Sequence, residues 1–342
     1  MGHGAGRQSV RRTRKRMMRR PDIPLTVLGG FLGAGKTSLL NHLLRTQQGE
    51  RVLVMVNDFG AINIDAELIA KAAPGMPEGI VSLTNGCVCC SVGGDLMQAF
   101  LTVLKLPEPP GRIVVEASGV GDPARIAQLG RAGGGFRSEG VVTVADAEAV
   151  RRLAGDRYVG DTVRAQLRAA DLVLLNKADL VGAGELDALR GWLGTQVPDA
   201  RVIACQHGQV DARLILGPAP GAIEAAARAG AGREGGHGVA MDTDHAAAFS
   251  GSSFASSIRF RRAALEGALN ALPPQVLRGK GMVFLEGEDS PRLLQICGKR
   301  WTLERPGPPE AAARSRIVFI AAKQAEGATF DPWRHFSPAL AG

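Results

Sequence analysis

The sequence has few cysteines, five among 342 residues. So small a number does not make a disulfide scaffold, and an odd number leaves one thiol over. The scarcity favours a reducing, cytoplasmic setting, where clustered thiols bind metals or catalyse more often than they cross-link. Three of the five nevertheless crowd into the stretch TNGCVCCSV, as Cys87, Cys89 and Cys90. A disulfide, a redox pair and a metal site are the three interpretations open at this point.

Long apolar runs are also missing. No stretch approaches membrane-spanning length, and no apolar segment follows the basic start, so neither a membrane span nor a secretory signal is expected. Residues 1–20 hold eight Arg and Lys and no acid. Without these eight, the 41 basic residues fall to 33, which equals the number of Asp and Glu. The net charge of +8 therefore reflects one short tail, and nucleic acid is not an expected partner.

What the chain does have is a regular alternation of short apolar runs and helix-like segments over residues 24–216. Most runs are continuously apolar and rich in β-branched residues, which is typical of strands buried on both faces of a parallel sheet. The expected strands are 25–30, 52–58, 79–85, 112–118, 141–146, 171–177 and 201–205, and the expected helices are 36–46, 94–104 and 184–196. This pattern predicts an α/β fold with a mostly parallel sheet flanked by helices.

The stretch GFLGAGKT (30–37) follows the first of these strands and opens a helix. It fits the phosphate-binding loop, a glycine and four residues followed by Gly-Lys-Thr, although a glycine-rich turn without a ligand is the alternative. Lys36 is expected to neutralise the β- and γ-phosphates, and the Thr37 hydroxyl to bind Mg²⁺. Backbone N–H groups between the glycines complete the phosphate site at a helix N-terminus. The predicted contacts are Gly30, Gly33, Ala34, Gly35, Lys36, Thr37 and Ser38.

The stretch NKAD (176–179) ends another buried strand, about 140 residues after the loop. An Asp at its end can accept hydrogen bonds from guanine N1–H and N2–H₂ together, a contact that adenine cannot reproduce. We therefore expect Asn176, Lys177 and Asp179 to bind the base and to favour GTP over ATP. A P-loop kinase acting on a small molecule is disfavoured by this element.

Two carboxylates can complete the metal and water geometry. Glu116 in VVEASG ends a strand and precedes Gly119, which is expected near the γ-phosphate, and Asp58 in VNDFG ends the strand after the loop helix. Either could instead be an ordinary carboxylate at the end of a strand. The predicted catalytic residues are Lys36, Asp58 and Glu116. No arginine stands out as an intrinsic finger, so slow unassisted hydrolysis is expected.

The motifs stand in the order found in the CobW-type metal-associated GTPases: GGFLGAGKTSLLNHLL, VNDFGAINIDAELI, LTNGCVCC, VVEASGVGDP and LLNKADLV. The chain resembles these proteins over about residues 24–216. The later stretches LRGKGMVFLEG, LLQICGKRW and RSRIVFIA resemble their C-terminal domain. The resemblance implies a GTPase that binds a transition metal, zinc or cobalt, and delivers it to a client metalloprotein or to a cobalamin pathway. It also implies GTP, GDP and Mg²⁺ as ligands, with a nucleotide-dependent homodimer as a further option.

The chemistry of the cysteine cluster agrees with a metal site. Adjacent Cys89 and Cys90 could form only a strained disulfide, and the cluster lacks the two-residue spacer of thioredoxin-like redox pairs. Thiolates favour zinc and similar cations, and three of them leave a fourth position open for exchange. The predicted transition-metal ligands are Cys87, Cys89 and Cys90. The alternative is a regulatory or RNA-associated GTPase without metal transfer, in which the basic tail is an anchor and the cysteines are structural.

Composition also divides the chain. Residues 217–256 contain few large apolar side chains and are predicted to form a linker, because they cannot bury enough apolar surface. A helix at 262–272 and several strand-like runs follow, which predicts a smaller α+β domain. The expected division is a disordered basic tail (1–22), a P-loop GTPase domain (23–216), a flexible linker (217–256), a C-terminal domain (257–323) and a second tail (324–342).

Overall fold

A computed structural model describes most of the chain outside the basic N-terminal segment. The described residues are 22–46, 50–56, 80–82, 88–219, 221–222, 248–305, 314–323 and 329–341, of which 80–82 and 88–95 are described by their backbone alone. The expected tail at 1–22 lies outside this part of the chain except for Asp22. No helix among the described residues is long and apolar enough to cross a membrane.

A sheet of seven parallel strands organises the first half of the described chain, in the order β3-β2-β4-β1-β5-β6-β7. Its strands are β1 (Ile23–Gly30), β2 (Val52–Val56), β3 (Ile80–Ser82), β4 (Arg112–Glu116), β5 (Phe136–Asp146), β6 (Leu172–Asn176) and β7 (Arg201–Ala204). Every residue of β2, β4 and β6 is buried, as the continuously apolar runs require. The predicted parallel α/β fold is confirmed.

Helices cover both faces of this sheet. Alternate side chains of each strand point to opposite faces, and because both sets are apolar, both faces must be covered. Leu28 and Leu174 belong to the core under α1 (Lys36–Thr46) and α8 (Ala212–Leu216). Val27 and Val173 belong to cores on the other face. The helices of that face are α3 (Val88–Lys105), α4 (Pro123–Ala132), α5 (Val150–Ala154), α6 (Gly160–Arg168) and α7 (Ala183–Gln196).

The C-terminal unit is a five-stranded antiparallel sheet in the order β11-β10-β9-β12-β8. Its elements are β8 (Phe249–Ser256), α10 (Arg262–Asn270), β9 (Val276–Val283), β10 (Arg292–Cys297), β11 (Arg300–Glu304), β12 (Ser315–Ala322), α11 (Pro332–Phe336) and η2 (Ser337–Ala339). Side chains from α10 and α11 share one apolar core with one face of this sheet. The expected smaller α+β domain is confirmed.

Two expected boundaries are wrong. Residues 249–256, assigned to the linker, form β8, which pairs with β12 over its whole length. Phe254 of this strand is buried and stacks on Trp333, and Phe249 packs against the core of α1 and α8. Backbone pairing and these two aromatic residues replace the missing aliphatic residues. The expected tail contains α11, which begins after Asp331 caps it and ends with the buried Phe336.

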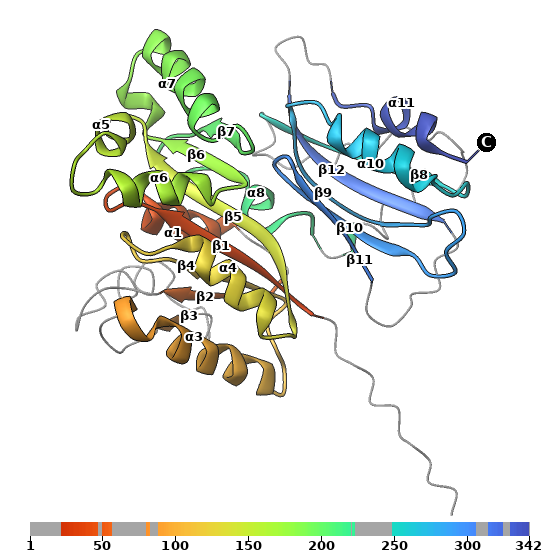
Figure 1. Cartoon of the computed structure of the whole chain (residues 1–342), viewed down its shortest axis with the longest axis horizontal. Coiled ribbons are helices and arrows are strands. Elements are labelled where there is room, and N and C mark those ends of the chain that lie inside the picture. The colour runs from red at the N-terminus through yellow and green to blue at the C-terminus, as the bar shows by residue number, and fades with distance from the viewer. Residues whose placement is uncertain are drawn as a thin grey trace, which may run out of the picture.

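The two sheets meet through α8 (Figure 1). Leu277, Cys297 and Ile320 of the C-terminal sheet join the same core as α1 and α8. The side chain of Arg278 is 1% exposed, and its Nε donates to the carbonyl oxygen of Leu214 at 2.8 Å. The C-terminal sheet therefore packs on the same face of the parallel sheet as α1.

Candidate nucleotide-binding site

The phosphate-binding loop joins the carboxyl end of β1 to α1, as predicted. Gly30 has φ +139°, and a Cβ there would lie 2.4 Å from the carbonyl oxygen of Val144 on β5. Gly35 has φ +102°, and a Cβ there would lie 2.3 Å from Nδ2 of Asn176 on β6. Both positions require glycine, because a side chain would be strained and would also clash. The loop consequently lies against the ends of β5 and β6.

The side chain of Lys36 folds back onto the phosphate loop. Lys36 is 8% exposed, and its Nζ donates to the carbonyl oxygen of Gly30 at 2.9 Å. The charge thus lies within the loop that would surround a phosphate. Thr37 and Ser38 follow in the first turn of α1, with Thr37 partly buried and Ser38 exposed. Gly33, with φ +74°, lies in the intervening turn.

Asn176 connects the base-recognition stretch to the phosphate loop. Its side chain is 2% exposed, and its Nδ2 donates to the carbonyl oxygen of Ala34 at 2.9 Å. Its Oδ1 accepts from the backbone N–H of Gly208 at 3.0 Å. A Cβ on Gly208 would lie 2.7 Å from the backbone nitrogen of Leu39, so this second turn lies against the start of α1. One buried amide therefore holds both loops that border α1.

The rest of the NKAD stretch lies at the surface edge of the sheet. Asp179 lies on the short helix η1 (Ala178–Leu180), and its side chain is 26% exposed. Lys177 adopts a left-handed backbone with φ +61°, and its Nζ forms an ion pair with Oδ2 of Asp146 at 2.6 Å. His207 comes close as well, with its Nε2 3.8 Å from Oδ2 of Asp179. The pairing with Asp146, at the end of β5, was not predicted from the sequence.

Glu116 lies at the same edge of the sheet as the phosphate loop, where the parallel strands have their carboxyl ends. It ends β4 in register with Leu28 of β1, and its side chain is 3% exposed. The turn after it packs on the phosphate loop, because a Cβ on Gly119 would lie 2.3 Å from Cδ2 of Leu32. The hydroxyl of Thr37 and the carboxylate of Glu116 are the hard oxygen donors that Mg²⁺ prefers, so the donor chemistry fits this ion.

Other predicted residues are described only in part. Asp58 and Cys87 lie outside the described residues, and Cys89 and Cys90 begin α3 with only their backbone described. Among the described side chains, no group of three or more His, Cys, Asp or Glu could hold a metal.

The remaining two cysteines, Cys205 and Cys297, are buried and free. Burial raises the pKa of each thiol to about 12, so both stay protonated at neutral pH and are poor metal ligands.

Comparison with known proteins identifies this arrangement. Residues 24–204 match the family described as the CobW/HypB/UreG nucleotide-binding domain, and residues 249–331 match the cobalamin synthesis protein CobW C-terminal domain. The chain belongs to the CobW family. It is therefore a P-loop GTPase, and the resemblance drawn from the motifs is confirmed.

Several relatives in this family are zinc chaperones by name. The zinc chaperone CobW of a Sinorhizobium species is 31% identical over an alignment of 305 positions, which covers 81% of this chain and 86% of that protein. The zinc chaperone YjiA of Escherichia coli is 30% identical over an alignment of 316 positions, which covers 87% of this chain and 93% of that protein. A crystal structure of Zn(II)-bound YjiA GTPase from E. coli aligns with 94% of this chain and 99% of that chain, at 22% identity and a TM-score of 0.43.

Proposed function

We propose that this CobW-family GTPase is a metallochaperone that binds zinc or cobalt through Cys87, Cys89 and Cys90. The observation that carries the proposal is the parallel pairing of β3 with β2, of β2 with β4 and of β4 with β1. The carboxyl ends of parallel strands meet at one edge of a sheet. The segment that leaves β3 toward the cysteines therefore starts at the same edge of the sheet as the phosphate loop. The zinc chaperones among the relatives support zinc as the metal.

The beginning of α3 suits thiolate chemistry. This helix starts at Val88, so Cys89 and Cys90 stand in its first turn. The helix dipole at an N-terminus favours negative charge and lowers the pKa of a nearby thiol. Three thiolates around a divalent cation leave a net charge of −1 and one open coordination position, and an open position is what transfer to a client metalloprotein requires. Free thiols suit a reducing, cytoplasmic setting.

The sheet also supports a coupling between nucleotide and metal. In the order β3-β2-β4-β1, three strand spacings, about 14 Å, separate β3 from β1. The segment that contains Asp58 leaves β2, between them. We infer that GTP, with Mg²⁺ held by Thr37 and Glu116, orders this segment, and that hydrolysis releases it and changes the affinity for the metal. The GTP-bound state is also where we expect a homodimer and engagement of the client.

The experiment is metal analysis of the full chain, purified without a histidine tag. It compares the unchanged protein with the double variant Cys89→Ser, Cys90→Ser. The unchanged protein should bind about one Zn²⁺ or Co²⁺, and Co²⁺ should give sulfur-to-metal charge transfer with tetrahedral d–d bands. Apparent affinity should rise with pH through the thiol range, because binding displaces protons. The double variant should lose these signals, whereas Cys297→Ala, which changes a thiol in the core, should keep them. Full stoichiometry and charge transfer in the double variant would refute the site.

The same preparation tests the coupling. Metal affinity measured with GDP should differ from that measured with a non-hydrolysable GTP analogue, because only the latter carries a γ-phosphate. Equal affinities would leave a metal-binding GTPase but contradict metal transfer driven by the nucleotide. Binding of RNA that is lost on removal of residues 1–20, together with retained metal stoichiometry in the double variant, would favour the RNA-associated alternative.

A further inference from the structure

The side chain of Gln166 on α6 crosses to the turn that follows Glu116. It is 2% exposed, and its Nε2 donates to the carbonyl oxygen of Gly119 at 3.1 Å and to that of Gly121 at 2.9 Å. A single amide thus uses both of its N–H groups on two carbonyls of one short turn. Sequence reasoning did not single out Gln166, since a lone glutamine on an amphipathic helix carries no signal of its own.

The turn that Gln166 holds is fastened to the phosphate loop on its other side. The backbone N–H of Ala117 donates to the carbonyl oxygen of Leu28 at 2.8 Å, which ties the turn to β1. Gly119 lies so close to Leu32 that a methyl group there would clash. With β1 on one side and α6 on the other, the turn has little freedom to move away from the loop.

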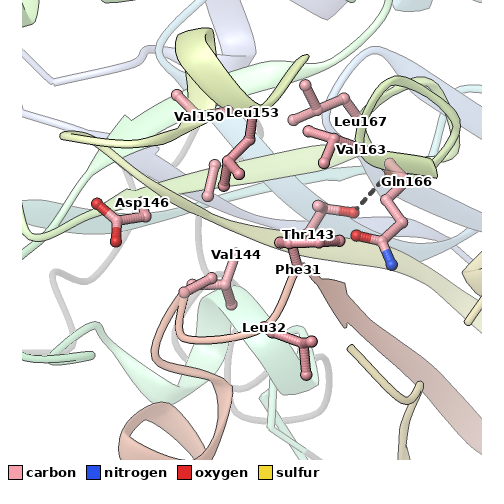
Figure 2. A pocket seen from close by; sticks show the side chains of 12 residues that line it. Phe31, Leu32, Thr143, Val144, Asp146, Val150, Leu153, Val163, Gln166 and Leu167 are labelled. Atoms are coloured by element: carbon pink, nitrogen blue, oxygen red, sulfur yellow. Dashed lines mark hydrogen bonds between the residues drawn. The ribbon is translucent and has the colours of Figure 1, made fainter. Parts of the chain in front are cut away.

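The helix that carries Gln166 is itself fixed. The hydroxyl of Thr143 on β5 donates to the backbone carbonyl oxygen of Gln166 at 3.0 Å (Figure 2). The side chain of Gln166 lines an apolar pocket together with Phe31, Leu153 and Leu167. Its Oε1 is buried and finds no hydrogen-bond partner in the described part of the chain. A buried oxygen without a partner lowers the stability of the fold. The favourable contribution of this amide therefore comes from its two N–H groups, which donate to Gly119 and Gly121.

We propose that Gln166 is a positioning residue for GTP hydrolysis, which holds the Gly119–Gly121 turn at the distance from the phosphate loop that the γ-phosphate requires. The inference rests on the proposed placement of Glu116 and Gly119 at the nucleotide. A group that is displaced by about 1 Å can cost a hundredfold in rate, so a buried fixture of this kind has a measurable effect on catalysis. Gln166 acts on the turn and needs no contact with the nucleotide.

The test is Gln166→Met, which keeps the length of the side chain and removes both donors together with the unpartnered oxygen. We expect kcat for GTP to fall about tenfold or more. Affinity for a non-hydrolysable GTP analogue should fall several-fold while affinity for GDP stays within about twofold, because only the γ-phosphate meets the turn. The melting temperature should fall modestly, because the carbonyl oxygens of Gly119 and Gly121 lose their donor while removal of the unpartnered Oε1 offsets part of that loss. A purely structural glutamine would lower stability alone and leave both kcat and the ratio of the two affinities unchanged.

The matched control is Thr143→Val, which removes a buried hydrogen bond to the same helix without touching the turn. It should lower stability and leave both kcat and the affinity ratio close to those of the unchanged protein. Gln166→Ala serves as a second variant with the same readouts if the methionine variant does not fold. Unchanged kcat and affinity ratio in a folded Gln166 variant would overturn the inference. An error in the nucleotide site itself shows separately, because Lys36→Ala would then remain active.

Discussion

The side-chain amide of Asn176 donates to the carbonyl oxygen of Ala34 at 2.9 Å, so the first residue of the base-recognition stretch holds the phosphate loop. The two motifs of the nucleotide site are thus one hydrogen-bonded unit. The same side chain accepts from Gly208, whose turn packs on the beginning of α1. A change at Asn176 is therefore expected to act on the phosphates as much as on the base.

Asn176→Ala should lower the free energy of unfolding by about 2 kcal/mol, because the N–H of Gly208 and the carbonyl of Ala34 lose a buried partner. Affinities for GTP and GDP should fall together, since the loop that contacts both nucleotides loses its support. Urea denaturation and nucleotide titration measure the two effects. The control is Asn270→Ala, which removes only an exposed hydrogen bond to Trp301 and should change neither quantity. An intact affinity for both nucleotides in a folded Asn176→Ala variant would contradict this role.

Asp179→Asn should weaken GTP binding and improve the binding of xanthosine triphosphate, whose base presents the reversed hydrogen-bond polarity. The carboxylate lies on η1, partly open to solvent, where a base can reach it. The control is Asp187→Asn on α7, which breaks an exposed ion pair with Arg190 and should leave the preference for GTP unchanged. Steady-state turnover of the two nucleotides, with ATP as the third substrate, checks the expectation. Equal use of ATP and GTP by the unchanged protein would refute the guanine assignment.

The nucleotide motifs could be predicted from the sequence because each is local. Eight consecutive residues after an apolar strand define the phosphate loop, and four residues after another define the base contact. The contact between Asn176 and Ala34 could not be predicted, because it joins positions 142 residues apart that only the parallel sheet brings together. Gln166 was missed for the same reason: its two acceptors lie on another strand's turn.

The C-terminal boundaries failed for a different reason. Composition marked residues 249–256 as linker, but a strand can be stabilised by backbone pairing on a sheet whose apolar core is supplied mostly by other segments, with Phe254 as its own contribution. Arg112 is the opposite case, because it is a charged residue that the structure buries. Its guanidinium pairs with Glu50 at 2.6 Å and donates to the carbonyl oxygen of Pro218 at 2.6 Å, beyond the end of α8. A charged residue at the start of an apolar strand gives no sign of such partners.

Lys36→Ala should reduce GTP turnover by about a hundredfold or more, because a fixed positive charge on the transferring phosphoryl group is lost. The fold should survive, since the ammonium group donates to loop carbonyls and supports no part of the apolar core. Phosphate release and circular dichroism measure activity and folding. Lys105→Ala, at the exposed end of α3, is the matched control and should retain full activity. Near-normal turnover of a folded Lys36→Ala protein would argue against a P-loop mechanism.

A buried ion pair joins the two sheets. Nζ of Lys280 on β9 lies 2.9 Å from Oε1 of Glu139 on β5, and both side chains are largely buried. Burial by itself raises the pKa of Glu139, but the positive charges of Lys280 and Arg137 outweigh it and hold this pKa below its usual value. A carboxylate whose pKa is lower in the folded protein stabilises the fold above its unfolded pKa, and loses that contribution as the pH falls through the folded value.

Glu139→Gln should therefore lower the free energy of unfolding by about 3 kcal/mol near neutral pH, because the ammonium group of Lys280 stays buried without its carboxylate. The difference from the unchanged protein should shrink as the pH falls below the unfolded pKa of a glutamate, about 4.3, and through the lower folded pKa of Glu139, where its carboxylate becomes protonated. Urea denaturation across that range measures it, and the comparison of the two proteins is designed to cancel groups that they share, such as Asp171, whose pKa is raised by burial. Asp161→Asn, which breaks an exposed pair with Arg164, is the control and should leave the free energy of unfolding almost unchanged across the same pH range. A difference that does not depend on pH would mean that Glu139 acts through packing and that its charge contributes nothing to holding the two sheets together.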